Sequence, residues 1–411
     1  MTLIIQKFGG TSLASPELIA KAAEKAVAER KLGNDVVVVV SARAGMTNEL
    51  VKQARAITCS SQHLNFVHEH DVVISAGEQI SAGLMAIAIS KLDVPAQSFL
   101  GWQLPILTDD NHSSANIYKI DPEKLQSTIR QGIIPVVAGF QGISRTGRIT
   151  TLGRGGSDLT AVALADALQA ERCDIYTDVD GVYTSDPKMV ENAKLLKNIM
   201  FEEMYVLAQH GAKVLQPQSV ESAWHRHVNL RVLSSFKSEN NAGTILCRNR
   251  KPCNPLQIQG IAMLNNRAKI TLSGVKQPLR TLTTIGVALD KARIKVEGNI
   301  QTLVQNRGSD QMMEISFIVA QVQQATACNV INKNKNLFSK MQTQDGKAAI
   351  TMVGNALRHT SMHKKIANVL VNRNICFETI AAFGIVFTVL VDNCSAAAAV
   401  KCLHRAFDLN K

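Results

Sequence analysis

The chain has 411 residues, more than a single hydrophobic core usually holds, so we expect two or three domains. Its 46% hydrophobic and 19% charged residues are those of a soluble globular protein, and the absence of a long apolar run or signal-peptide pattern predicts a cytoplasmic location without a membrane. Nearly all of the net charge of +12 lies in residues 256–411, where the basic residues are dispersed among few aromatics, which argues against a nucleic-acid partner.

The N-terminus predicts a strand, a glycine loop and a helix. Residues 3–8 form an apolar strand that runs into Gly9-Gly10, and Ser15 then caps a helix over 16–31 that has proline in its first turn. No G-x-x-x-x-G-K-[ST] run occurs in the chain, so this is not a Walker A loop. Lys7 stands at the strand end, where a lysine can face bound phosphates.

The following stretches predict further strands and helices. Residues 35–40 are a β-branched run typical of a strand buried on both faces of a parallel sheet, and the loop 41–48 follows at its carboxyl end, where ligands bind in open α/β sheets. Residues 72–78 lead into a helix through Lys91, which puts Glu78 in the first helical turn. With another apolar strand at 133–140, the alternation predicts a doubly wound sheet.

A glycine-rich stretch at 150–157 runs into a helix-forming sequence. A helix start offers unpaired backbone N–H groups and a partial positive charge, and glycines let those amides approach an anion closely. Arg154 adds a forked donor suited to a carboxylate or a phosphate. By itself, this stretch predicts an anion site.

A polar turn after another strand narrows the anion to a nucleotide. Residues 175–187 read as a strand end that opens into an acceptor-rich turn and stops at Pro187. Together with Lys7-Phe8-Gly9-Gly10-Thr11-Ser12, this turn resembles the amino-acid kinase family, and the ordered motifs are similar to those of aspartokinases. The resemblance covers the whole chain and is densest up to about residue 240. It implies a three-layer αβα kinase domain with a mainly parallel central sheet over residues 1–250.

The C-terminal part reads as an internal repeat. Residues 247–255 are basic, interrupted by prolines and poor in apolar side chains, as in an interdomain linker. Beyond them, residues 256–342 and 343–411 share one pattern of strands around a helix. These two units resemble the tandem ACT domains of aspartokinases, which are small α+β ferredoxin-like units that pair across subunits and hold amino-acid effectors. The resemblance therefore implies an allosteric homo-oligomer, a dimer or larger, joined through this half.

The resemblance also implies a reaction. Aspartokinases move the γ-phosphoryl group of ATP to the β-carboxylate of L-aspartate, giving 4-phospho-L-aspartate, in the first step of lysine, threonine and methionine biosynthesis. Mg²⁺ is held mainly through the nucleotide phosphates, and the eight cysteines have no zinc-site spacing, so we expect no metal ligands from the protein.

The site residues follow from the motif matches. The resemblance assigns charge stabilisation during catalysis to Lys7 and Asp158. It assigns aspartate binding to Ser41, Thr47, Glu78, Arg154, Gly155, Gly156 and Ser157. ATP binding falls to Lys7, Phe8, Gly9, Gly10, Thr177, Asp178, Tyr183, Asp186, Pro187, Lys188 and Lys213. In this scheme Arg154 binds the α-carboxylate of aspartate and Glu78 binds its ammonium group.

The sequence alone leaves alternatives open. It does not distinguish aspartate from another acidic amino acid as the substrate. Two proteins of other functional classes are also compatible with it: a nucleotide-binding regulatory protein with weak catalysis, and an RNA-binding protein.

In the ACT-like half, two turns depart from the family pattern. The family's Asp-x-Pro-Gly turn is replaced by Lys276-Gln277-Pro278-Leu279, and its Gly-x-Gly-Met by Gly354-Asn355-Ala356-Leu357. Because acids and glycines that would contact an effector are lost, we expect inhibition by lysine to be weak or absent.

Overall fold

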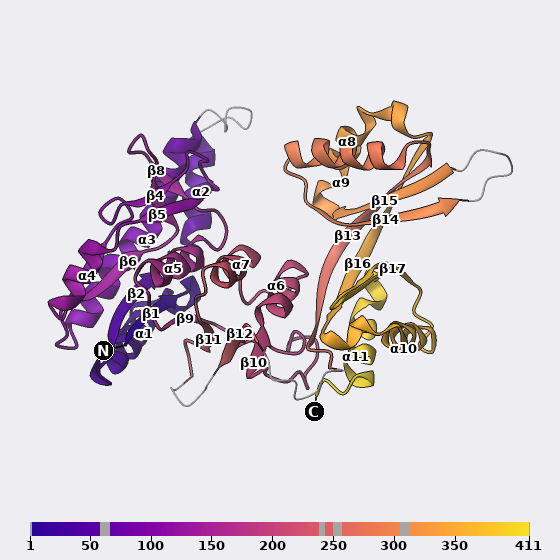
Figure 1. The fold of residues 1–411 in the computed structure, drawn as a ribbon. Helices are drawn as coiled ribbons and strands as arrows, with labels where there is room; N and C mark the ends of the chain where they lie inside the picture. Colours follow the sequence, from indigo (N-terminus) through magenta and orange to yellow (C-terminus); the bar gives the residue numbers. More distant parts are fainter. Residues whose placement is uncertain (1, 58–65, 238–242, 250–256, 305–311, 411) are drawn as a thin grey trace. The chain divides into compact units, whose positions relative to one another are not determined.

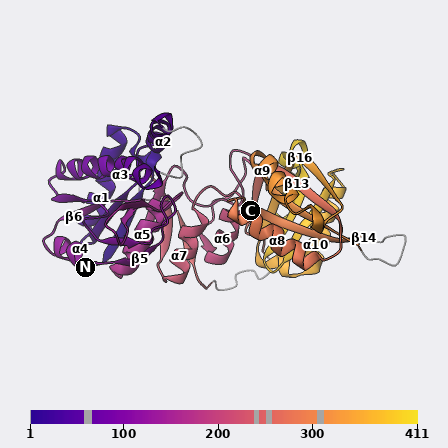
Figure 2. The ribbon, with the colours of Figure 1, turned by 90° about the horizontal axis from the view of Figure 1, so that it is seen from above.

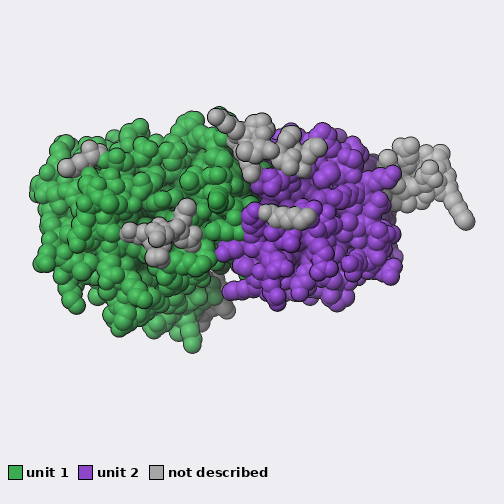
Figure 3. All heavy atoms as spheres, turned by 90° about the horizontal axis from the view of Figure 1, so that it is seen from below, with its two compact units in different colours: residues 1–182, 195–208, 213–251 green, residues 183–194, 209–212, 252–411 purple. Residues whose placement is uncertain are grey.

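The structure is a computed structural model that describes residues 2–57, 66–237, 243–249, 257–304 and 312–410, so most of the predicted linker lies outside the described residues. The chain forms two compact units (Figure 3). Unit 1 comprises Met1–Val182, Leu195–Ala208 and Lys213–Lys251, and unit 2 comprises Tyr183–Lys194, Gln209–Ala212 and Pro252–Lys411. The boundaries expected from sequence, 1–250, 256–342 and 343–411, stay predictions.

Within the described residues, unit 1 contains an eight-stranded sheet in the order β10-β12-β11-β9-β1-β2-β6-β3. Neighbouring strands are parallel except β11 with β12. The strands are β1 Leu3–Phe8, β2 Asp35–Val40, β3 Ala96–Phe99, β6 Ile134–Ala138, β9 Arg172–Thr177, β10 Asn198–Met200, β11 Leu230–Ser234 and β12 Thr244–Cys247. A smaller sheet contains β4 Ile106–Thr108, β5 Ile117–Ile120, β7 Gln141–Ile143 and β8 Ile149–Thr151. The mainly parallel sheet is as predicted.

Helices cover both faces of this sheet. α1 (Pro16–Lys31) and α3 (Val67–Ser90) lie side by side on one face, in one core with Phe8 and Val38 (Figures 1 and 2). α5 (Gly156–Ala167) covers the opposite face, and the Ser15 hydroxyl caps α1 as predicted. The remaining helices of this region are α2 Met46–Ile57, α4 Glu123–Arg130, α6 Phe201–Gln209, α7 Pro217–His225 and the 3-10 turn Gly10–Leu13.

α3 begins earlier than the sequence predicted. We expected Glu78 in the first turn, but the helix begins at Val67 and Glu78 lies in its middle. The β-branched residues at 72–74 favour a strand locally, and burial of Ile74 against the rest of unit 1 overrides that preference. By length and composition, α3 is the described helix that could cross a membrane; half of its most apolar stretch is buried in the structure, and it carries the buried Asp71, as a core helix does.

Unit 2 is built on one antiparallel sheet in the order β14-β15-β13-β16-β18-β17. A β-α-β-β-α pattern occurs twice, so each repeat has two helices where we expected strands around one. The first repeat contains β13 Gly260–Val275, α8 Pro278–Lys291, β14 Val296–Val304, β15 Met312–Ala320 and α9 Gln324–Asn332; the second contains β16 Lys340–Val353, α10 Thr360–Val371, β17 Phe377–Phe383, β18 Val386–Asp392 and α11 Asn393–Ala406. Short 3-10 turns cover Gln321–Gln323, Lys335–Leu337 and Asn355–Arg358. β13 pairs with both β15 and β16, so the two repeats share one sheet (Figure 1).

Candidate active site

Backbone hydrogen bonds join the carboxyl ends of four neighbouring strands, β9, β1, β2 and β6. Gly9 N–H donates to the Tyr176 carbonyl at 3.1 Å, Ser41 N–H to the Phe8 carbonyl at 3.1 Å, and Gly139 N–H to the Val40 carbonyl at 3.0 Å. The loops that follow β1, β2 and β6 therefore start at one edge of the sheet, where open α/β sheets bind ligands.

A cavity of about 230 Å³ lies at this edge, and we call it the substrate cavity. Its lining residues are Lys7, Ser41, Ala42, Thr47, Glu78, Phe140, Gly153, Arg154, Gly155, Gly156, Ser157 and Asp158. Every residue that the sequence proposed for catalysis or aspartate binding is in this set. The sequence analysis did not assign Ala42, Gly153 or Phe140 to the site. Phe140 is the last residue of the predicted strand 133–140, and its position at the carboxyl end of that strand was the available signal.

Lys7 and Asp158 form a buried ion pair in the substrate cavity, with Lys7 Nζ 2.6 Å from Asp158 Oδ1. Side chains alternate along a strand, so Phe8 packs under α1 and α3 while Lys7 faces α5. Asp158 is in the first turn of α5, where the positive end of the helix dipole favours an anion. The pair therefore holds the lysine ammonium in one place.

Glu78 is a buried carboxylate with one oxygen satisfied. Its Oε1 accepts a hydrogen bond from Ala42 N–H at 2.9 Å, and Oε2 is buried with no partner among the described residues. Burial raises the pKa of Glu78 to about 7, while the Ala42 N–H and the charge of Lys7 act in the opposite direction. A cation that reached Oε2 would satisfy it and lower the pKa again.

The glycine loop has a backbone that only glycine accommodates. Gly155 has φ +76°, and a Cβ on it would lie 2.3 Å from Cγ of Gln216. Gly155 is also the N-cap of α5, so the backbone turns directly into the helix start. Between the glycines, Arg154 is exposed, and no described residue pairs with its guanidinium. The loop thus presents a cation at the rim of the substrate cavity.

The residues predicted for ATP binding come from both units. Phe8, Gly9, Gly10, Thr177, Asp178 and Lys213 belong to unit 1, while Tyr183, Asp186, Pro187 and Lys188 belong to unit 2. Among this set Lys7 also lines the substrate cavity. The Phe8 ring is fully buried and stacks on Tyr176 at 4.7 Å between centroids, so the side chain of Phe8 is a core group and only its backbone is available to a ligand.

Residues 183–194 pack into the core of the second repeat of unit 2. We call them the nucleotide segment because the sequence predicts that four of them bind ATP. Val190 is buried in one cluster with Ile350 and Leu403. The Thr184 hydroxyl lies 2.9 Å from Nε2 of His404 and donates to the Leu409 carbonyl at 3.1 Å. The segment is therefore anchored by the second ACT-like repeat.

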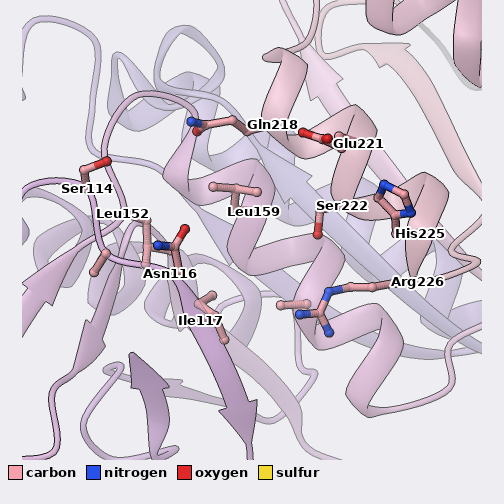
Figure 4. A pocket seen from close by; sticks show the side chains of 12 residues that line it. Ser114, Asn116, Ile117, Leu152, Leu159, Gln218, Glu221, Ser222, His225 and Arg226 are labelled. Atoms are coloured by element: carbon pink, nitrogen blue, oxygen red, sulfur yellow. The ribbon is translucent and has the colours of Figure 1, made fainter. Parts of the chain in front are cut away.

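A larger cavity, of about 370 Å³, lies elsewhere in unit 1 and contains none of the predicted site residues. Figure 4 shows Gln218, Glu221, Ser222 and His225 of α7 on one side and Asn116 and Ile117 on the other, with Leu159 of α5 between them. The residues predicted for catalysis and aspartate binding therefore line the smaller of the two cavities.

The described residues contain no group of three His, Cys, Asp or Glu side chains placed to hold a metal ion. The two carboxylates of the substrate cavity are engaged by Lys7 and by the Ala42 N–H. This donor set fits a magnesium ion carried by nucleotide phosphates better than one held in a protein cage.

The chain is similar to known proteins over its whole length. The amino acid kinase family model matches residues 2–234. The chain is 40% identical over 415 residues to the aspartate kinase of Pseudomonas fluorescens (strain SBW25), covering 100% of this chain and 98% of that protein. It is 39% identical over 414 residues to aspartokinase 2 of Bacillus subtilis (strain 168), covering 100% and 99%.

Two solved structures of E. coli aspartokinase III are similar to the whole chain. The complex with aspartate and ADP, in the R-state, has a TM-score of 0.78 at 25% identity and covers 99% of this chain and 100% of that one. The complex with lysine and aspartate, in the T-state, has a TM-score of 0.75 at 26% identity and covers 98% and 99%.

Proposed function

The chain belongs to the aspartokinases of the amino acid kinase family and phosphorylates aspartate, and from this membership we propose how its residues bind aspartate and ATP. One observation carries the proposal: the substrate cavity combines a buried unpaired oxygen of Glu78, the unpaired guanidinium of Arg154 and the oriented ammonium of Lys7. The relative solved with aspartate and ADP supports ATP as the phosphoryl donor.

The charges in the substrate cavity match the charges of aspartate. The α-ammonium group pairs with Glu78 Oε2, which removes the cost of leaving that oxygen buried and unpaired. The α-carboxylate pairs with Arg154, whose fork binds a carboxylate through two parallel hydrogen bonds. Ser41, Thr47 and the amides of residues 155–157 add neutral donors. The β-carboxylate is then the group directed at ATP.

In the transfer step, a β-carboxylate oxygen forms a bond to the γ-phosphorus, and the bond from that phosphorus to the β,γ-bridging oxygen breaks. ADP leaves with the electron pair. The carboxylate is already ionised at neutral pH, so no general base is required. The difficulty is repulsion between an anionic acceptor and a polyanionic nucleotide, and Lys7, held by Asp158, offsets it.

We propose that the amides of Gly9 and Gly10, together with Thr177, Asp178 and Lys213, bind the nucleotide from unit 1. The sequence motifs add Tyr183, Asp186, Pro187 and Lys188 to the residues proposed for ATP binding. Mg²⁺ carried by the phosphates would neutralise part of their charge.

We also propose that the chain is cytoplasmic and forms a homo-oligomer, a dimer or larger, through its ACT-like half. In the described part of unit 2, β14 and β17 are the edge strands of the sheet, and Phe383 on β17 is 69% exposed. Pairing between copies closes such edges. Light scattering of the purified chain should show an assembly, and a fully active monomer would rule this proposal out.

Regulation is proposed separately. The complex of E. coli aspartokinase III with lysine and aspartate supports lysine as an effector within the family. The substitutions at 276–279 and 355–357 predict that this chain responds weakly.

The test of the proposed site is an assay of ATP turnover with aspartate, glutamate and N-acetylglutamate, using the native chain, Arg154→Ala and Arg148→Ala. Arg148 is the control because it is an exposed arginine paired with Glu69. Of the three acceptors, we expect only aspartate to support ATP turnover. Arg154→Ala should raise the aspartate KM about ten-fold or more while the ATP KM stays constant. An unchanged aspartate KM in Arg154→Ala would refute this substrate site, and equal use of glutamate would refute the substrate choice.

A further inference from the structure

Asp71 is a fully buried carboxylate outside the substrate cavity. It accepts five hydrogen bonds: from His112 Nδ1 at 2.8 Å, from the Ser113 N–H at 3.0 Å and hydroxyl at 3.2 Å, and from the Thr151 N–H at 3.1 Å and hydroxyl at 2.6 Å. A buried anion is costly unless donors surround it, and here they come from two segments distant in sequence.

Both segments support the glycine loop. Thr151 is the last residue of β8, three positions before Arg154, and its carbonyl accepts from Ala115 N–H at 2.9 Å. Ser113 has φ +65°, a conformation that is strained for a residue with a side chain, and its two bonds to Asp71 hold it there. A Cβ on Gly153 would lie 3.2 Å from the Ser113 carbonyl, so the glycine loop rests directly on this strained turn.

Asp71 and Glu78 are seven residues apart on α3, which is about two helical turns, so they lie near one face of the helix. Glu78 lines the substrate cavity, and Asp71 fixes the start of the loop that carries Arg154. α3 therefore carries Glu78, which we assign to the substrate ammonium group, and it also supports the loop of Arg154, which we assign to the substrate α-carboxylate.

We propose that Asp71 is a positioning residue for aspartate binding, acting through Thr151 and the turn at His112-Ser113 on the loop of Arg154. The inference rests on the proposed pairing of Arg154 with the substrate α-carboxylate. Asp71 does not line the substrate cavity, so its effect reaches aspartate through the backbone of residues 151–154.

Adjacent threonines allow a matched test. Thr151→Val removes the hydroxyl that donates to Asp71, and Thr151→Ser keeps it. Thr150→Val removes an equally buried hydroxyl from the same strand, which lies 2.6 Å from the Thr108 hydroxyl and not against Asp71. The readouts are the KM values for aspartate and ATP and the melting temperature.

Thr151→Val should raise the aspartate KM about ten-fold without changing the ATP KM. Thr151→Ser should have the aspartate KM of the native chain. Thr150→Val should lower the melting temperature comparably and leave both KM values unchanged. Equal KM shifts in the two valine variants, or no shift in Thr151→Val, would overturn the role of Asp71. Arg154→Ala separates the two levels: if it leaves the aspartate KM unchanged, the proposed site fails, and if it raises that KM while Thr151→Val does not, only this inference fails.

Discussion

The substrate cavity and the nucleotide segment are built in different ways. All twelve residues that line the substrate cavity belong to unit 1. The nucleotide segment, residues 183–194, belongs to unit 2, where Thr184 bonds to His404 and Val190 is part of the repeat's core. We propose that residues of unit 1 recognise aspartate, whereas the residues predicted from sequence for ATP binding are divided between the two units. We therefore expect changes in the nucleotide segment to affect ATP binding and to leave aspartate binding unchanged.

The largest expected effect concerns catalysis itself. Lys7→Ala removes the ammonium group that offsets repulsion between aspartate and ATP, so kcat should fall by a factor of about 10³ or more. Lys347→Ala is the control, because it also breaks a lysine–aspartate pair, 2.7 Å long, but an exposed one in unit 2. Near-normal turnover of Lys7→Ala, with folding verified by circular dichroism, would remove Lys7 from the mechanism.

The second prediction concerns the free energy of unfolding that is lost because Glu78 is buried with no partner for its Oε2 among the described residues. Burial raises its pKa from 4.5 to about 7, so between these pH values the folded chain keeps a proton that the unfolded chain has released. The free energy of unfolding therefore falls as pH rises through this window, and the loss is complete above about pH 7. Glu78→Gln has no ionisable group at this position, so its free energy of unfolding does not fall between pH 4.5 and about 7. Relative to the native chain, its free energy of unfolding should therefore increase by about 3 kcal/mol over this pH range.

Urea unfolding of both proteins at pH 5 and pH 8, without substrates, measures this difference. Glu69→Gln, an exposed position on the same helix, should behave like the native chain at both pH values. Parallel pH profiles for the native chain and Glu78→Gln would show that Glu78 ionises normally.

A smaller effect is expected in the nucleotide segment. Thr184→Val removes the hydroxyl that bonds to His404 and Leu409, and it should raise the ATP KM about three-fold while leaving the aspartate KM unchanged. Thr388→Val is the control, since Thr388 is buried in the same repeat and bonds to Thr351 instead. If the aspartate KM moved and the ATP KM did not, the division between the two regions would be wrong.

The smallest effect is expected from lysine. Titration of aspartate-dependent ATP turnover with lysine, threonine and both together should lower the rate less than about two-fold, because the effector turns of this chain lack the family's acids and glycines. Strong inhibition at sub-millimolar lysine would show that the effector site persists with other contacts.

Local sequence patterns predicted the central strands and the first helix of unit 1, because these patterns have local physical causes. The continuous β-branched run of β2, the Ser15 cap of α1 and the glycine loop each have a direct chemical cause, and each lies where it was expected. The start of α3 was mispredicted because Val72 and Val73 favour a strand locally, and only packing within unit 1 decides otherwise.

Long-range features could not be read from the chain. Asp71 is bonded to residues about 41 and 80 positions away, and nothing in its own neighbourhood marks it as buried. The two helices of each C-terminal repeat and the sheet that the repeats share depend on the pairing of β13 with β16, which periodicity does not encode. The burial of the nucleotide segment in unit 2 likewise follows from tertiary contacts.

The central claim is that the substrate cavity recognises aspartate through Glu78, and the steady-state KM values of Glu78→Gln test it most directly. At pH 8 the native Glu78 is ionised and can pair with the substrate ammonium, whereas glutamine cannot. The account predicts that the aspartate KM rises about ten-fold or more while the ATP KM stays within about two-fold of the native value. A rise in the ATP KM with an unchanged aspartate KM would contradict it.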